Sequence, residues 1–163
     1  MHKEMTLTDT IRMVEIAAGG QPPVKSIVRN DIFRLNSLPD ARYSVFGWTQ
    51  GNHSSDLESY FYTYRFTFFY IDRLTADQSN ETEIQSVGIQ VLDNILRMLA
   101  DNGVETEGEW QFTTFNQRFL DECAGVYCSV GLSVPVNGMC SDTFFDFNED
   151  FNEDFNAKGI TIY

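Results

Sequence analysis

Residues 60–70, YFYTYRFTFFY, decide the fold class. Every even-numbered position in this stretch is aromatic, whereas Thr63, Arg65 and Thr67 lie between them. Because successive side chains of a strand point to opposite faces, the alternation predicts one long strand with an aromatic face. A base-stacking platform would need more basic neighbours than Arg65 and Arg73. The aromatic face is therefore predicted to be the core side of an antiparallel sheet.

The segments on either side extend this sheet and cover it. Residues 43–50 alternate as a strand, and the polar stretch 51–56 is typical of a flexible hairpin loop, so a long hairpin is predicted. After the central strand, Asn80 and Glu83 have the spacing of a capping box. A helix follows, ended by Asn102-Gly103, with an apolar stripe of Ile84, Val87, Val91, Leu92, Ile95 and Leu99.

The remaining segments complete an α+β pattern. An N-terminal helix capped by Thr6 or Thr8 ends at Gly19-Gly20, and two further strands are expected at 110–120 and 124–136. Residues 24–38 fit a strand or a broken helix, and the strand is favoured. The predicted fold is an antiparallel β-sheet with a long hairpin and helices packed on one face.

The C-terminal region has a different composition. Residues 144–156 repeat an Asp-Phe-Asn-Glu unit with period four, and they contain no branched aliphatic side chain for a core. We therefore divide the chain into an α+β domain, 1–137, and an acidic, Phe-rich tail, 138–163, that docks on a partner or a neighbouring subunit. The residues expected to dock are Phe147, Phe151, Phe155, Asp150 and Asp154.

Charge excludes several classes of partner. The chain has 11 Lys and Arg against 24 Asp and Glu, a formal net charge of -13. Binding that neutralises many phosphates requires a basic surface, so specific nucleic-acid binding and docking on anionic membranes are not expected. The longest apolar stretch, 66–71, is far shorter than the ~20 residues that span a bilayer, and the N-terminus lacks the apolar stretch of a secretory signal.

The sequence contains none of the common catalytic or metal-binding patterns. Its histidines are His2 and His53, the three cysteines form no C-x-x-C pair, and the glycine-rich phosphate loops are missing. The acidic repeat fails as a calcium loop, because Phe151 stands where the loop starting at Asp146 needs glycine, and Ala157 where it needs glutamate. We predict a protein that is not an enzyme and has no metal or cofactor.

Five segments carry a resemblance to a known family. They are NDIFRLN (30–36), YSVFGWTQ (43–50), FFYIDRL (68–74), IQSVGI (84–89) and NQRFLDECAGV (116–126). Together with the order of elements over residues 5–136, they resemble tail-terminator and head–tail joining proteins of tailed bacteriophages, most like those of Bacteroides and crAss-like phages.

The resemblance implies a structural virion protein, made in the host bacterial cytoplasm and located in the neck or tail. Its expected partners are other copies of itself in a closed ring of about six or twelve, and the neighbouring portal, neck and tail rings. Double-stranded DNA would pass through the ring without specific binding.

An acidic wall suits such a conduit, because passing DNA is repelled from it. From their loop positions, the predicted lumen-facing acids are Asp56, Glu58, Glu105, Glu107 and Glu109. The alternative is an acidic adaptor or DNA-mimic module that binds a basic protein partner.

Overall fold

The computed structural model describes residues 5–56, 58–119, 121–135, 155 and 158–163. Its helices are α1 (Leu7–Gly19) and α2 (Glu81–Asp101), with a 3-10 helix η1 (Ile32–Ser37). Its strands are β1 (Ser26–Arg29), β2 (Val45–Gln50), β3 (Ser54–Asp56), β4 (Phe61–Arg73), β5 (Glu105–Thr106), β6 (Thr113–Arg118), β7 (Glu122–Pro135) and β8 (Thr161–Ile162).

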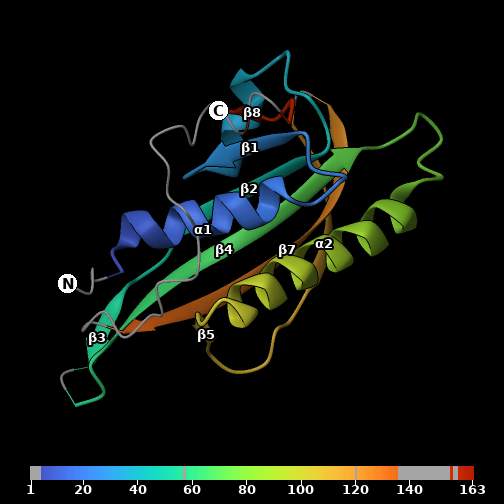
Figure 1. Cartoon of the computed structure of the whole chain (residues 1–163). Helices are drawn as coiled ribbons and strands as arrows, with labels where there is room; N and C mark the ends of the chain where they lie inside the picture. Colours follow the sequence, from blue (N-terminus) through green and yellow to red (C-terminus); the bar gives the residue numbers. More distant parts are fainter. Residues whose placement is uncertain (1–4, 57, 120, 136–154, 156–157) are drawn as a thin grey trace.

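The strands form one open sheet in the order β5-β7-β4-β2-β1-β8, with β3 also paired to β4 and β6 to β7 (Figure 1). The long central strand β4 is antiparallel to β2, β3 and β7. Strand β1 is parallel to β2 and to β8, so the sheet is mixed and the expectation of a purely antiparallel sheet is wrong. The connection through η1 returns the chain to the end of the sheet at which β1 begins, so β2 can run parallel to β1. The α+β class is confirmed.

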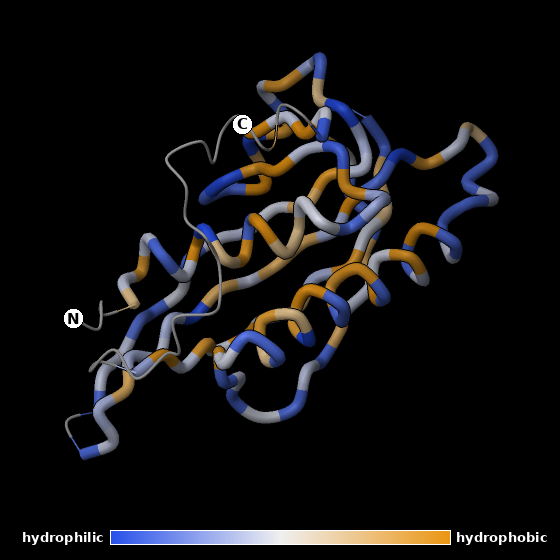
Figure 2. Tube along the Cα trace, viewed as in Figure 1, coloured by the Kyte–Doolittle hydropathy of each residue, from blue (hydrophilic) through white to orange (hydrophobic). Residues whose placement is uncertain are grey.

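The aromatic face of β4 forms the centre of the core. Tyr64, Phe66, Phe68 and Tyr70 are buried there under α1 and α2, which both cover this face (Figures 1 and 2). Tyr60 is the exception: its side chain is 63% exposed, because a φ of 56° places it in the turn before β4. The prediction that the helices pack on one face is confirmed. On the opposite face, η1 covers a smaller cluster of Val28, Ile32, Leu35, Ala41, Val45, Ile71, Phe119 and Cys123.

Of the two predicted helix caps, one is present in the structure and the other is not. Thr6 caps α1, since its hydroxyl accepts a hydrogen bond from the Asp9 N–H and the Asp9 carboxylate accepts one from the Thr6 N–H. The capping box predicted at Asn80 is wrong, because the Asn80 side chain makes no capping hydrogen bond to α2. Its amide instead accepts from the Thr75 N–H and donates to the Arg73 carbonyl, so Asn80 closes the loop before the helix.

Two further expectations are corrected locally. Residues 24–38 contain the favoured strand only as β1, because a φ of 68° at Asn30 ends it and Asp31 then caps η1 through the Phe33 N–H. The loop predicted at 51–56 is wrong in its second half: β3 pairs with the start of β4 and the hairpin turn lies after Asp56. Residues 51–53 form a bulge, held where Arg65 donates to the carbonyl of Asn52 and the hydroxyl of Ser54.

The end of the predicted tail belongs to the domain. Phe155 is 4% exposed in the main core, Ile160 is buried beside it, and β8 pairs with β1. The boundary at residue 137 is therefore wrong for these C-terminal residues, because their apolar side chains find a site on the chain's own sheet. Phe147, Asp150, Phe151 and Asp154 lie outside the described residues.

The loop before α2 leads to a prediction on acid stability. Asp77 accepts hydrogen bonds from the Thr75 hydroxyl and from the N–H and hydroxyl of Ser79, which lower its pKa to about 2. Because the pKa is lower in the folded state, this contribution to stability is present above the carboxyl's ordinary pKa of 3.8 and is lost as the pH falls toward 2. The Asp77→Asn variant is expected to lose less of its urea midpoint than the parent chain between pH 5 and pH 2, whereas Asp40→Asn, in another exposed loop, matches the parent. Equal acid sensitivity of all three chains contradicts the prediction.

Candidate functional site

The hairpin of β2, β3 and β4 projects beyond the helices as an arm (Figure 1). We call the sheet end that it forms the arm end. Asp56 pairs there with Phe61, and Phe61 pairs with Pro135 at the end of β7. Strand β5 adjoins the same end, since Glu105 pairs with Ser133. The arm end thus carries the hairpin turn, the exposed Tyr60 ring and the start of the loop that follows β5.

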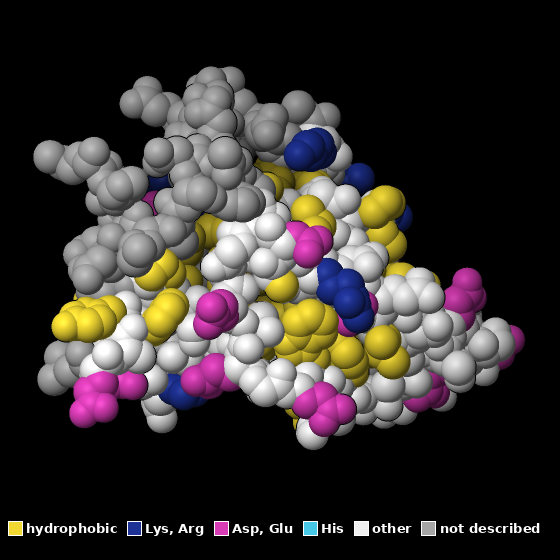
Figure 3. Space-filling view, turned by 60° about the horizontal axis from the view of Figure 1, so that its bottom comes forward, with side chains coloured by type: hydrophobic (Ala, Val, Ile, Leu, Met, Phe, Trp, Pro, Cys, Tyr) yellow, Lys and Arg dark blue, Asp and Glu magenta, His cyan; other side chains and the backbone are white. Residues whose placement is uncertain are grey.

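The five acids predicted to face a lumen are all exposed, and Asp56, Glu58 and Glu105 lie at the arm end. The loop with Glu107 and Glu109 runs back beside β7, because the Glu107 N–H bonds to the Gly131 carbonyl and Thr113 pairs with Tyr127. Asp56 lies on β3, Glu58 in the hairpin turn, Glu105 on β5, and Glu107 and Glu109 in the loop that follows. The Glu58 N–H donates to the Asp56 carboxylate and lowers its pKa. Acidic side chains are also spread over the face shown in Figure 3, with fewer Lys and Arg side chains among them.

An ion pair changes the role of one of these acids. Arg65 Nη2 lies 3.3 Å from Glu107 Oε2, and both side chains are partly exposed. The pair borders a hollow of about 460 Å³ on the sheet face opposite α1 and α2. No sequence pattern indicates this contact, which joins positions 42 residues apart. It neutralises Glu107 locally and leaves Asp56, Glu58 and Glu105 as the predicted acids at the arm end.

The sheet face around this hollow is polar where η1 does not cover it. Thr67 and Ser129 lie 3.0 Å apart through their hydroxyl oxygens, and Thr63 and Ser133 lie 3.3 Å apart. These cross-strand pairs join β4 to β7 on a shallow surface. Such a surface suits contact with another protein better than enclosure of a small ligand.

A buried carboxylate joins α1 to the sheet. Glu15 is 0% exposed, and its two oxygens each accept a 2.7 Å hydrogen bond from the Arg29 guanidinium. One of them also accepts from Trp48 Nε1 at 3.0 Å. Because these donors satisfy the charge inside the fold, the group holds α1, β1 and β2 together and leaves no free base. Sequence reasoning missed it, since the three residues share no local pattern.

The buried thiols are poorly suited to nucleophilic chemistry. Burial raises the pKa of Cys123 to about 11, so the thiol stays protonated at neutral pH. Its neighbour Tyr43 lies under the Arg73 guanidinium, 4.7 Å from the ring centroid, and Arg73 also pairs with Asp121 at 2.9 Å. His53 is engaged elsewhere, since its Nδ1 accepts a hydrogen bond from the Arg65 N–H in the arm.

The described residues contain neither a metal-ligand cluster nor a membrane-spanning helix. Among them, no group of three or more His, Cys, Asp and Glu side chains is placed to hold a metal ion. Within the same part of the chain, no helix has the length and apolar character needed to cross a membrane.

The C-terminal residues occupy a seat at the opposite end of the sheet, formed by Gly19 and β1. A Cβ built on Gly19 would collide with the Phe155 ring and would lie 3.2 Å from Ile160 Cδ1. The backbone adds three hydrogen bonds: Thr161 N–H to the Lys25 carbonyl, Tyr163 N–H to the Ile27 carbonyl, and Arg29 N–H to the Tyr163 carbonyl. Glycine at position 19 thus makes room for the aromatic ring.

The Gly19→Ala variant is expected to release this C-terminal segment. The methyl group must displace the Phe155 ring, whereas the nearest atom to a Cβ on Gly20 is 3.5 Å away, an ordinary contact. Alanine gains up to about 1 kcal/mol in helix propensity, which offsets only part of the burial that Phe155 and Ile160 lose, so the domain is also somewhat less stable once the segment detaches. Hydrogen exchange at the Thr161 and Tyr163 amides should accelerate at least tenfold in Gly19→Ala and stay unchanged in Gly20→Ala. Unchanged exchange in both variants would show that the ring is not seated against Gly19.

The comparisons with known proteins add no family to this description. No model of a known protein family matches the sequence, and no curated protein matches it. The proposed function therefore rests on the surfaces described above and on the sequence resemblance of residues 5–136.

Proposed function

We propose that the chain is a ring subunit of the neck or tail of a tailed bacteriophage, which joins portal to tail and surrounds the path of the DNA. The observation that carries the proposal is the projecting arm, with exposed carboxylates on the elements of its end. Projecting hairpins are suited to reaching a neighbouring subunit or lining a lumen. The sequence resemblance over residues 5–136 supports the same function.

Ring closure requires a heterologous interface, in which one surface of a subunit contacts a different surface of the next. The chain offers two such surfaces. One is the arm end with the exposed Tyr60, and the other is the uncovered polar sheet face around Arg65 and Glu107. We propose that these surfaces belong to the contacts that close a ring of about six or twelve copies.

The arm-end carboxylates suit the wall of a DNA conduit. Asp56, Glu58 and Glu105 are exposed and are not among the acids that form ion pairs in the described part of the chain. An acidic wall repels the phosphates of passing DNA. It also presents no cationic side chains that could bind the phosphates and displace their counterions, so the duplex slides past without being held.

The first test is the oligomeric state. Native mass spectrometry and negative-stain images of the full chain, alone and with the portal-side ring of its virion, should show closed annuli of six or twelve subunits. A chain that remains monomeric or dimeric under both conditions, and competes with DNA for a basic protein, would instead be the acidic adaptor.

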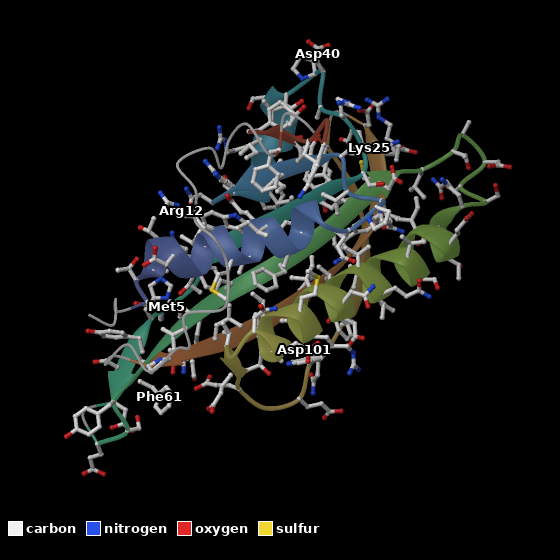
Figure 4. The ribbon with its side chains drawn as sticks, in the orientation of Figure 1. Met5, Arg12, Lys25, Asp40, Phe61 and Asp101 are labelled. Atoms are coloured by element: carbon white, nitrogen blue, oxygen red, sulfur yellow. The ribbon has the colours of Figure 1, made fainter. Side chains whose placement is uncertain are left out.

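The second test is charge reversal at the arm end. We expect Glu58→Lys combined with Glu105→Lys to increase DNA retention by rings and to lower infectivity at least tenfold. The matched control combines Asp40→Lys with Glu83→Lys, which makes the same charge change at exposed positions away from the arm end (Asp40 is labelled in Figure 4). Equal effects of the two pairs would mean that the arm end does not face DNA.

A further inference from the structure

The two ends of the C-terminal connection lie far apart on the sheet. Strand β7 ends at Pro135, which pairs with Phe61 at the arm end. Strand β8 begins at Thr161, which pairs with Ser26, and the register continues through Val45 to Ile71. Phe61 and Ile71 are ten residues apart on β4, about 33 Å along the strand. Figure 4 shows this separation, with Phe61 at one end of the molecule and Lys25, next to Ser26, toward the other.

The segment that returns to the sheet is a small, separable unit. Its described contacts include the Phe155 ring on Gly19, the buried Ile160 side chain, and the Ile162 and Tyr163 side chains packed on the two apolar clusters. They also include three backbone hydrogen bonds to β1 and its preceding residue, one from Arg42 to the Gly159 carbonyl, and one from the Tyr163 hydroxyl to the Asp40 carbonyl. An aromatic anchor followed by a short strand added to a sheet edge is a common way for proteins to bind a peptide. The seat can therefore recognise this segment whichever copy of the chain supplies it.

Chain length permits either source. Pro135 and Phe155 are 20 residues apart in the sequence, and an extended chain of this length spans up to about 65 Å. That reach exceeds the distance to the chain's own seat. It also reaches the seat of a neighbour placed against the arm end, where β7 finishes.

We propose that residues 155–163 are exchanged between copies of this chain, so that Phe155 and β8 of one subunit occupy the Gly19–β1 seat of the next. The segment packs and hydrogen-bonds in the neighbour's seat as it does in its own, so the exchange has little intrinsic energetic penalty. The effective concentration of each seat decides between them, and a neighbour that places its Gly19–β1 seat against the arm end brings that seat close to Pro135. The inference rests on the proposed function only for the identity of the recipient as the next subunit of a ring.

Disulfide trapping between two chains that each carry one introduced cysteine tests the exchange. The native Cys123 and Cys128 stay in both chains, where they are buried. Ser26 and Thr161 face each other in the β1–β8 register, and the Ser26 side chain is buried beneath that pairing. Full-length Ser26→Cys and Thr161→Cys chains of different mass, both also carrying Cys140→Ser, are unfolded together and refolded up to about 1 mM, a typical effective concentration for a short linker. After oxidation, the exchange predicts a covalent heterodimer whose fraction rises with concentration.

The control for disulfides formed by random collision of two chains pairs Ser26→Cys with Ser55→Cys, which lies on the exposed strand β3. We expect at least fivefold more heterodimer from the Ser26–Thr161 pair than from this control. If Ser26→Cys fails to fold, Ile27→Cys with Ile162→Cys offers the next register pair. A single chain carrying both Ser26→Cys and Thr161→Cys reports closure of the seat within one molecule.

The inference would be overturned if the heterodimer fraction did not exceed that of the control at any concentration while the doubly substituted chain formed its disulfide within one molecule. Native mass spectrometry of the same samples separates this from the proposed function. Closed rings without the heterodimer would reject exchange and leave the ring intact. The heterodimer with only open or dimeric assemblies would support exchange and contradict the ring.

Discussion

Replacing Glu15 by alanine is expected to lower the free energy of unfolding by about 3 kcal/mol. The carboxylate is fully buried, pairs with Arg29 through two 2.7 Å hydrogen bonds and accepts a third from Trp48. Its removal leaves a partly buried guanidinium without its counter-charge and an indole N–H without its acceptor. Leaving buried polar groups unpaired costs more free energy than the intact pair contributes, which makes this change larger than the loss of an ordinary surface pair.

Urea unfolding of a small variant set measures this effect. Glu15→Gln keeps an acceptor for Trp48 but loses the charge, so its destabilisation should lie between the parent and Glu15→Ala. The control is Asp93→Ala, which removes an exposed ion pair to Arg97 four residues away and should change stability by less than about 0.5 kcal/mol. If Glu15→Ala and Asp93→Ala gave equal unfolding free energies, the Glu15 network would not hold α1 to the sheet.

The parts of the fold predicted from sequence are those with a long periodic pattern. The alternation from Tyr60 to Tyr70 locates β4 and its core face, and the apolar stripe from Ile84 to Leu99 locates α2. Strand β8 has two residues and no period, and its pairing with β1 joins distant parts of the chain, so no local pattern reveals it. The glycine that receives Phe155 is also indistinguishable in sequence from a glycine that merely ends a helix.

Local sequence signals were also overridden by other hydrogen bonds in the folded chain. Asn80 and Glu83 have the residue types and spacing of a capping box, yet the Asn80 side chain forms hydrogen bonds with Thr75 and Arg73 instead. The polar stretch 51–56 resembles a turn, but Arg65 holds its bulge and lets β3 extend the hairpin. The same hairpin was nevertheless predicted, because the two long strands on either side determine that the chain must reverse.

The candidate site, like the fold, could be predicted from the sequence only in part. Exposed acids in polar segments are identifiable from sequence, and all five predicted ones are exposed, with Asp56, Glu58 and Glu105 at the arm end. The partner of Glu107 was not identifiable, because Arg65 faces it only when β4 and β5 both pair with β7. Charges that look equivalent in sequence therefore differ in the folded chain.

Gly125→Ala is expected to destabilise the domain by about 3 kcal/mol, the upper part of the range for overpacking a core. Gly125 is buried on β7, where a Cβ would collide with the Tyr70 carbonyl oxygen on the neighbouring strand and lie 2.8 Å from the Phe115 ring. The Phe115 ring has some freedom to move, but the carbonyl belongs to the central strand β4. Relief of that collision must shift one strand relative to the other.

Gly131→Ala provides a matched control on the same strand and the same sheet face. A Cβ there meets only the Glu107 side chain among its three nearest atoms, and this flexible, exposed group can rotate away. The variant should differ from the parent by less than about 0.5 kcal/mol, because alanine also lowers the entropy lost by a glycine on folding. Urea unfolding followed by circular dichroism measures both changes. Equal unfolding free energies for the two variants would show that β7 has room beside β4 at Gly125, and the close approach of the two strands would then not explain the glycine.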